Sequence, residues 1–248
     1  MLIGRADVAE LAARAPTIDA FAAETVKLEQ VDVLQVTYEI AARHREDLLP
    51  PGLHPLNPPL LTWLFWRCRS SPWGAFAMAQ TRLECRSGVR ARAFLVAAVV
   101  NNEEAAGALA AKWGYLARTG AVALRREGAV VRGSVVCHTR EVLDIEVTGL
   151  EALGTEDVQY VANMNLAHTP SGLRLVQVEP EVHVQRAERG RPRLDAFDAP
   201  AWGDARILPV YPVAASLVTA DLELAPVRFV CRPDVLAFEG TERVGRKE

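Results

Sequence analysis

Short runs of β-branched and aliphatic residues recur roughly every ten residues through the second half of the chain. Turn-forming residues separate these runs, and such spacing is typical of antiparallel β-structure. The runs lie at 122–125, 130–136, 142–147, 173–178, 182–185, 207–210, 213–224 and 227–231. The pattern predicts a mostly antiparallel β-fold with few helices. Only 188–192 and the charged residues 239–248 are expected to be loose, so we expect a single domain over residues 1–248.

The first half of the chain adds further strands. Residues 7–15 are expected to form a short helix within an N-terminal arm of residues 1–27. Alternation of apolar residues predicts a strand over 31–40, followed by a short helix that ends before the prolines at 50 and 51. Apolar runs predict buried strands at 60–67 and 93–100.

A helix is expected directly after the strand at 93–100. An Asn and a Glu three residues apart in Asn101-Asn102-Glu103-Glu104 form a capping-box pattern at its start. The helix should run from Glu103 to about Trp113, and Gly114 should end it.

Charge and hydropathy exclude several classes of partner. The 248 residues carry 28 basic and 31 acidic side chains, a net charge of −3, without a basic stripe for phosphates. We therefore expect no nucleic-acid partner. The longest apolar run, 93–100, is far shorter than a membrane span, and the first residues lack the order of a secretory signal. These features predict no membrane partner and a cytoplasmic location.

The cysteines and lysines also limit the chemistry. The four cysteines lie far apart, without a C-x-x-C pair or a histidine at metal-ligand spacing, so we expect reduced thiols and no metal. No phosphate loop or Gly-rich dinucleotide motif is present, and no cofactor is expected. Only Lys27, Lys112 and Lys247 supply amines.

Several segments, in order, resemble the acetoacetate decarboxylase superfamily. Residues 48–53 are similar to its Leu-Leu-Pro-x-x-Leu segment, and 71–76 to its Ser-x-x-Gly-x-Tyr turn. Residues 99–105 resemble its strand-to-helix passage, and 163–170 its Asn-Tyr-x-Leu-Lys-x-x-Pro segment. The sequence 113–118 falls on the Gly-Tyr/Phe-Pro-Lys-Lys motif, and 208–210 and 219–222 resemble the closing strands. The resemblance implies an antiparallel β-barrel or cone around a closed cavity, with a few flanking helices and assembly into a homo-oligomer.

The resemblance fails at its catalytic centre. In the family the first lysine of the motif forms a Schiff base with a keto acid, and the second lowers the pKa of that amine. Here the two positions hold Ala117 and Arg118. Alanine has no amine, and arginine is a permanent cation that cannot serve as the nucleophile. We therefore expect no Schiff-base chemistry at this position.

Other polar positions of the family also carry apolar residues here. The acid after the Gly-x-Tyr turn falls on Met78, the acid on the preceding strand on Trp63, and a substrate-binding arginine on Val31. Together with Phe76 and Ala117, these residues predict a cavity wall for a hydrophobic small molecule. The alternative is that they fill the barrel as packing.

Three residues are candidates for catalysis. Arg118 inherits a motif position that should face the cavity, where it could hold a carboxylate or carbonyl oxygen, with a rim salt bridge as the alternative. Tyr115 could donate a hydrogen bond or serve only in packing. His168 could act as an acid or base, or be a structural histidine. A Schiff base displaced to Lys112 is a further hypothesis.

Two classes of function follow. The leading hypothesis is a biosynthetic enzyme that encloses a hydrophobic, polyketide-like substrate and promotes its cyclisation, for example by cycloaddition, without an imine. A lyase, aldolase or dehydratase that uses other residues is a variant of it. The rival hypothesis is a non-catalytic member of the family that binds a small molecule.

Overall fold

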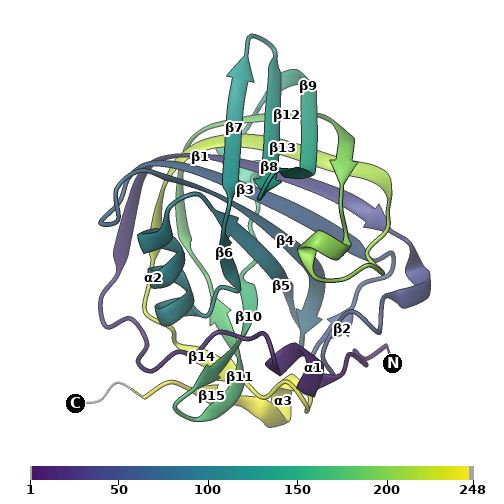
Figure 1. The fold of residues 1–248 in the computed structure, drawn as a ribbon, viewed down its shortest axis with the longest axis vertical. Coiled ribbons are helices and arrows are strands. Elements are labelled where there is room, and N and C mark those ends of the chain that lie inside the picture. The colour runs from purple at the N-terminus through teal and green to yellow at the C-terminus, as the bar shows by residue number, and fades with distance from the viewer. Residues whose placement is uncertain (1, 246–248) are drawn as a thin grey trace.

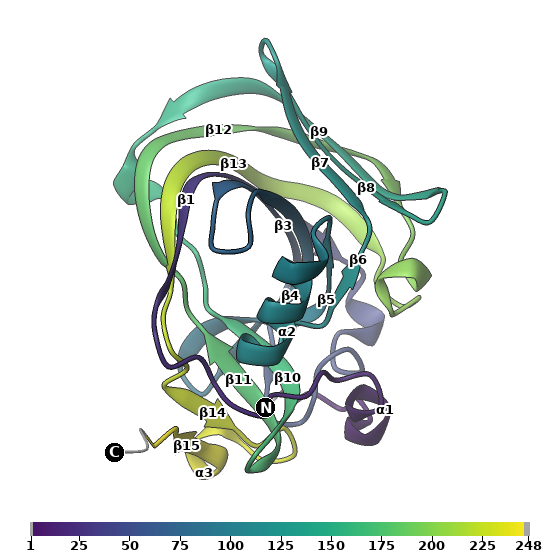
Figure 2. The ribbon, with the colours of Figure 1, turned by 60° about the vertical axis from the view of Figure 1, so that its left-hand side comes forward.

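The computed structural model describes residues 2–245, which form one large coiled sheet with helices at its sides (Figures 1 and 2). The 15 strands follow the order β15-β14-β11-β10-β5-β4-β3-β1-β13-β12-β9-β8-β7, with β2 beside β4 and β6 beside β5. The elements are α1 (Val8–Ala12), β1 (Val26–Ile40), β2 (His54–Pro55), β3 (Leu60–Ser70), β4 (Phe76–Ser87), β5 (Arg90–Val100), α2 (Glu103–Trp113), β6 (Ala117–Thr119), β7 (Ala121–Glu127), β8 (Val130–Cys137), β9 (Arg140–Leu153), β10 (Asn163–Thr169), β11 (Gly172–Val178), β12 (Glu181–Phe197), β13 (Pro209–Leu224), β14 (Phe229–Cys231), α3 (Ala237–Gly240) and β15 (Thr241–Arg243).

The mainly β fold is confirmed, with two differences from the expected barrel. The strands β6 and β10 both pair with β5 in the parallel direction, so the sheet is mixed. Within residues 2–245 the strand order begins at β15 and ends at β7, so the sheet coils without closing. Parallel neighbours cannot be joined by a two-residue hairpin, so the chain reaches both strands from β5 by longer crossover connections.

The helix α2 begins and ends where the sequence places it. The side chain of Asn102, not Asn101, caps it by accepting a hydrogen bond of 3.0 Å from the Ala105 backbone N–H. Asn101 instead accepts from the Ala77 backbone N–H. Gly114 ends the helix with φ +70°, a conformation that favours glycine. This turn leads the chain directly into Tyr115.

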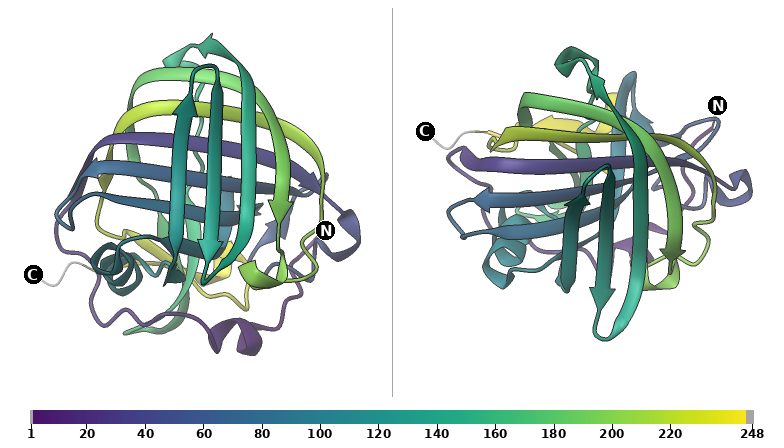
Figure 3. Two further views of the ribbon diagram at one scale, coloured as in Figure 1. Left: turned by 45° about the horizontal axis from the view of Figure 1, so that its top comes forward. Right: turned by 90° about the horizontal axis from the view of Figure 1, so that it is seen from above.

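The strands β7–β9 form a second layer that crosses the outside of β1 and β3 (Figures 1 and 3). Successive side chains of a strand point to opposite faces, so β1 and β3 supply one apolar cluster between the layers and another inside the coil. The layers approach closely at Gly133, where an added Cβ would lie 2.9 Å from Cζ of Phe65. The inner cluster surrounds the site described below.

Some local expectations were wrong. The segment after β1 forms only a three-residue 3-10 turn, Ala42–His44, rather than a helix. Residues 188–192 lie within β12, where Arg189 pairs with Glu151 of β9 across the ladder. β12 lies between β13 and β9, so this segment is paired on both sides although two of its charged side chains, Arg189 and Arg191, are exposed.

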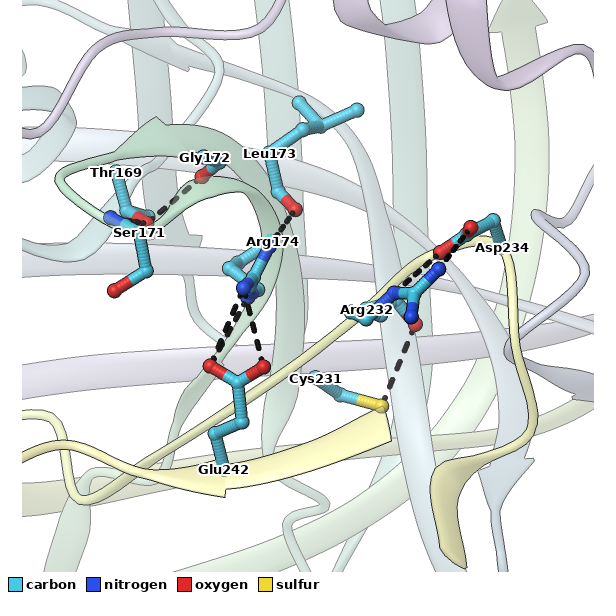
Figure 4. A network of polar contacts seen from close by, with 9 residues as sticks. All are labelled: Thr169, Ser171, Gly172, Leu173, Arg174, Cys231, Arg232, Asp234 and Glu242. Atoms are coloured by element: carbon cyan, nitrogen blue, oxygen red, sulfur yellow. Dashed lines mark hydrogen bonds and ion pairs between the residues drawn. The ribbon is translucent and has the colours of Figure 1, made fainter. Parts of the chain in front are cut away.

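The segment 239–248, expected to be loose, contains ordered structure. Its residues Thr241–Arg243 form β15 beside β14, and Glu242 pairs with Arg174 of β11 (Figure 4). Residues 246–248 lie outside the described part. The N-terminal arm is tied to β10 by a bridge between Thr17 and His168. Between residues 2 and 245, every helix is too short or too polar to cross a membrane.

Candidate functional site

A small cavity lies inside the coiled sheet. Its volume is about 20 Å³, which holds roughly one water molecule. Most of its wall is apolar, and the polar side chains of the wall are an arginine, two tyrosines and an asparagine. The lining residues are Val33, Leu64, Trp66, Arg82, Tyr115, Tyr160, Val161, Asn163, Pro180, Val182 and Leu222.

Arg82 is the one charged residue of this wall. It comes from β4 next to a bulge, where Thr81 pairs with Ala97 and Arg82 with Leu95. The residue is only 2% exposed. Its Nη1 donates to the Asn163 side chain at 2.9 Å, whereas Nε and Nη2 have no hydrogen-bond partner among the described residues. Burial lowers the pKa of the Arg82 guanidinium, although arginine stays protonated in proteins.

Two tyrosine hydroxyls belong to the same wall. Tyr115 is fully buried, and neither its hydroxyl nor that of Tyr160 has a partner within residues 2–245. Burial raises the pKa of both phenols, and the nearby Arg82 charge opposes that rise. Both therefore remain protonated at neutral pH and can donate hydrogen bonds.

Asn163 fixes the position of the arginine. Its Oδ1 accepts from Arg82, and its Nδ2 donates to Oε1 of Gln80 at 2.8 Å. All three side chains are almost completely buried. This chain of hydrogen bonds joins β4 to β10 and leaves two buried guanidinium nitrogens without a partner among residues 2–245.

Such an arrangement suits an oxygen anion or a polarised carbonyl. Leaving buried donors unpaired costs free energy, and a ligand oxygen would remove that cost. A guanidinium and two hydroxyls inside an apolar wall can stabilise developing negative charge, because the surroundings screen it weakly. The wall contains no carboxylate or imidazole, so it offers no general base with a pKa near neutral.

Sequence comparison agrees with this architecture. The model of the family described as "Acetoacetate decarboxylase (ADC)" matches residues 13–232, almost the whole chain. The chain belongs to the acetoacetate decarboxylase family. No curated protein matches the chain significantly in sequence.

Solved structures of an acetoacetate decarboxylase and of two other enzymes share the fold. The decarboxylase from Legionella pneumophila is 16% identical with a TM-score of 0.73, over 83% of this chain and 86% of that one. The enduracididine biosynthesis enzyme MppR, complexed with pyruvate, is 18% identical with a TM-score of 0.68, over 84% and 90%. An acetoacetate decarboxylase-like enzyme from Sphingomonas wittichii RW1 is 19% identical with a TM-score of 0.65, over 83% and 92%.

Within this family fold, the structure places one expected catalytic residue, Tyr115, at the cavity. Four expected wall residues, Val31, Phe76, Met78 and Ala117, belong to or pack against the inner apolar cluster but do not line the cavity. They pack in the same apolar cluster as several of the lining residues. The methyl group of Ala117 stands at the position that the resemblance assigned to the Schiff-base lysine.

Two expected residues face away from the cavity. Arg118 follows Ala117 on β6, and the alternation of side chains along a strand turns it outward. There its guanidinium lies 5.7 Å from the ring centre of Trp202 and donates a hydrogen bond to the Ala201 carbonyl. Trp63 is buried between the layers, 5.4 Å from the Tyr38 ring. Trp66, three residues along β3, lines the cavity instead.

His168 has a structural position. Its ring Nε2 lies 3.1 Å from the Ala12 carbonyl oxygen, and its backbone exchanges hydrogen bonds with Pro16 and Ile18. The side chain is exposed and attaches the N-terminal arm to β10. It does not reach the cavity wall.

The lysines that the structure describes lie at the surface. Lys112 donates to the Ala20 carbonyl at 3.3 Å, and Lys27 is 3.7 Å from Glu223. Neither lines the cavity, and Lys247 lies outside the described residues.

Sequence reasoning missed Arg82 and Tyr160. The signal for Arg82 is an arginine three residues after the apolar run 75–79, on a strand that this run indicates to be buried, where an unpaired charge is rare. Asn163 opens one of the family-like segments, but its contact with β4 depends on the sheet order. Tyr160 lies in the irregular segment before β10, and no pattern marked it.

Proposed function

We propose that the chain is a biosynthetic enzyme that binds a largely apolar substrate in this cavity and promotes its cyclisation without an imine. One observation carries the proposal: Arg82 presents two unpartnered guanidinium nitrogens beside two unpartnered tyrosine hydroxyls, within an apolar wall. A substrate carbonyl or carboxylate oxygen that accepts from Arg82 would be held and polarised. Arg82 thus takes the role that the sequence suggested for Arg118.

The wall also restricts the reaction. A cycloaddition forms its new carbon–carbon bonds from π electrons, moves no proton and needs no base, in keeping with a wall that has none. Enclosure of a flexible chain in a reactive conformation supplies part of the rate enhancement. Hydrogen bonds from Arg82 to a carbonyl that gains negative charge supply another part.

A ligand must displace lining side chains, because the cavity holds roughly one water molecule. Tyr160 and Val161 belong to the irregular segment between Asp157 and Asn163. Such segments move more easily than strands that are hydrogen-bonded on both sides. This segment is therefore the part of the wall that we expect to move when substrate enters.

The small volume favours a second candidate, decarboxylation of a short 3-oxo acid. The bond between the carboxylate carbon and the α-carbon breaks, carbon dioxide leaves, and the electron pair forms an enolate. Arg82 would stabilise the enolate oxygen, and solvent would protonate the carbon. This reaction also needs no base from the protein.

The test is product analysis by mass spectrometry on two sets of compounds. One set contains 3-oxo acids of increasing chain length, and the other contains linear polyenes that carry a conjugated ketone. Cyclisation gives a product of unchanged mass, and decarboxylation gives one lighter by carbon dioxide. Turnover should fall at least ~100-fold in Arg82→Met, as is usual for removal of an oxyanion donor, and persist in Arg118→Ala.

Three results would count against the proposal. Turnover that survives Arg82→Met excludes Arg82 as the donor. Binding without product, detected by native mass spectrometry, would favour the non-catalytic binding protein. A borohydride-trapped adduct at Lys112 would restore imine chemistry.

A further inference from the structure

A second, larger pocket lies on the opposite face of the sheet from the Arg82 cavity. Residues of β7 and β8 line it on one side and residues of β1, β3, β12 and β13 on the other, and its volume is about 200 Å³. Asp32 and Arg67 line it, whereas their strand neighbours Val33 and Trp66 line the inner cavity. The two sites are therefore separated by the thickness of the sheet.

The outer pocket is strongly basic. Five arginines and only two carboxylates line it, and the side chains of four of these arginines lie on its side of their strands, an excess of two positive charges in a chain whose net charge is −3. The rest of its wall consists of Leu124, Val131, Leu217 and Thr219. The arginines are Arg67, Arg69, Arg125, Arg126 and Arg186.

The carboxylates hold part of this cluster in place. Asp32 is 8% exposed and accepts from Arg67 Nε at 2.9 Å and from Arg69 Nη2 at 2.7 Å. Glu188, also 8% exposed, accepts from Arg126 Nη2 at 3.0 Å and Arg186 Nη2 at 3.1 Å. The hydrogen bond from Arg126 keeps the pKa of Glu188 below its ordinary value, so this carboxylate stays ionised.

Several donors remain free for a ligand. Arg186 uses only Nη2 in its contact with Glu188, so its Nε and Nη1 have no partner among residues 2–245. Arg125 is paired with Arg132 across β7 and β8, whereas Arg126 is paired with Val131 of the pocket wall, so the Arg125 side chain leaves β7 on the face away from the pocket. Guanidinium groups brought together repel one another unless an anion compensates them. Their planar forks also match the oxygens of a phosphate group.

We propose that this pocket binds the phosphate group of a small organic phosphate ester. The two excess positive charges suit a phosphate monoester dianion better than the single charge of a carboxylate. The apolar side chains of Leu124, Val131 and Leu217 offer a contact surface for the organic part. This site is independent of the function proposed for the Arg82 cavity.

The test is isothermal titration calorimetry of the whole chain with phenyl phosphate and with inorganic phosphate, at one ionic strength of about 0.15 M because exposed charges are screened by salt. We expect saturable binding of phenyl phosphate, weaker binding of inorganic phosphate, and at least a tenfold loss of affinity in Arg186→Gln, since a lost charged contact costs about 1.4 kcal/mol or more.

Two controls locate the site. Arg43→Gln changes an exposed arginine at a 3-10 turn outside this pocket and should bind as the unchanged chain does. Arg82→Met removes the charge of the inner cavity and should also leave phosphate binding unchanged. If Arg186→Gln is unstable, Arg186→Lys gives a second test, because it keeps the charge but loses the planar fork and should still weaken binding of phenyl phosphate.

The proposal is overturned if phenyl phosphate gives no saturable heat, or if Arg186→Gln binds phenyl phosphate as well as the unchanged chain does. Loss of binding in Arg82→Met would mean that the phosphate binds in the inner cavity and not in the outer pocket. Equal affinity for phenyl phosphate and inorganic phosphate would mean that the pocket binds free phosphate. That result would contradict the proposal that its ligand is an ester.

Discussion

Arg82 of β4 donates a hydrogen bond of 2.9 Å to the side chain of Asn163 on β10, although the two strands are separated by β5 in the sheet. Asn163 is 3% exposed and also donates to Gln80. Nη1 of Arg82, which donates to Asn163, also lies 3.5 Å from the Val161 carbonyl oxygen, to which it donates, whereas Nε and Nη2 have no partner within residues 2–245. Leaving two buried donors unpaired lowers stability.

The cost of that arrangement can be measured. Asn163→Leu should lower the free energy of unfolding by about 1–3 kcal/mol, because it leaves Arg82 and Gln80 unpaired in a buried position. Arg82→Met should be close to neutral, since removal of a buried, partly unpaired charge offsets the lost hydrogen bond. Urea unfolding of both variants and of their double variant gives the coupling energy. Additive effects of the two substitutions would contradict a direct interaction.

The contact between the two layers gives a second prediction. Gly133→Ala places a Cβ 2.9 Å from the Phe65 ring and should cost about 1–3 kcal/mol of stability, as overpacked cores do. Gly107→Ala is the matched control. No atom lies within 4 Å of its added Cβ, and in a helix it should stabilise by roughly 0.5–1 kcal/mol. Thermal unfolding followed by circular dichroism separates the two, and equal shifts would argue against the close approach at Phe65.

Stability should fall at alkaline pH. Burial raises the pKa of Tyr115 and Tyr160 above the ordinary value, so above about pH 10 the unfolded chain loses protons that the folded chain keeps. Their contribution is complete below that pH and is lost as the pH rises, by up to about 1.4 kcal/mol per pH unit for each tyrosine.

Urea unfolding between pH 8 and 11 measures this slope. The variant Tyr115→Phe/Tyr160→Phe provides the comparison, because it lacks both phenols and should show a shallower fall. The same slope in the two proteins would mean that neither phenol is buried in solution.

The surface positions of Arg118 and His168 give a fourth prediction. Arg118→Ala loses the contact with the Trp202 ring, worth about 0.5–1 kcal/mol at an exposed site. His168→Ala loses the ring contact to Ala12, so proteolysis should cut the N-terminal arm faster. Neither change should alter ligand affinity at the Arg82 cavity in calorimetry. A tenfold loss of affinity in either variant would return that residue to the site.

The sequence by itself determined the elements whose causes are local. The ten-residue spacing of strands, the Asn before Glu103 and the glycine at 114 act within a few residues of themselves, and each gave the predicted element. The family-like segments also indicated the fold, and Tyr115 within one of them does line the cavity.

Only the tertiary structure decided which side chains meet. Strand residues alternate between faces, so a register difference of one residue separates an inner side chain from an outer one. That alternation turned Arg118 and Trp63 outward and Trp66 inward. The sheet order then brought Arg82 to Asn163, and the crossing of β7 over β3 gathered the outer arginines. These contacts join strands far apart in the chain, so no local pattern of residues could encode them.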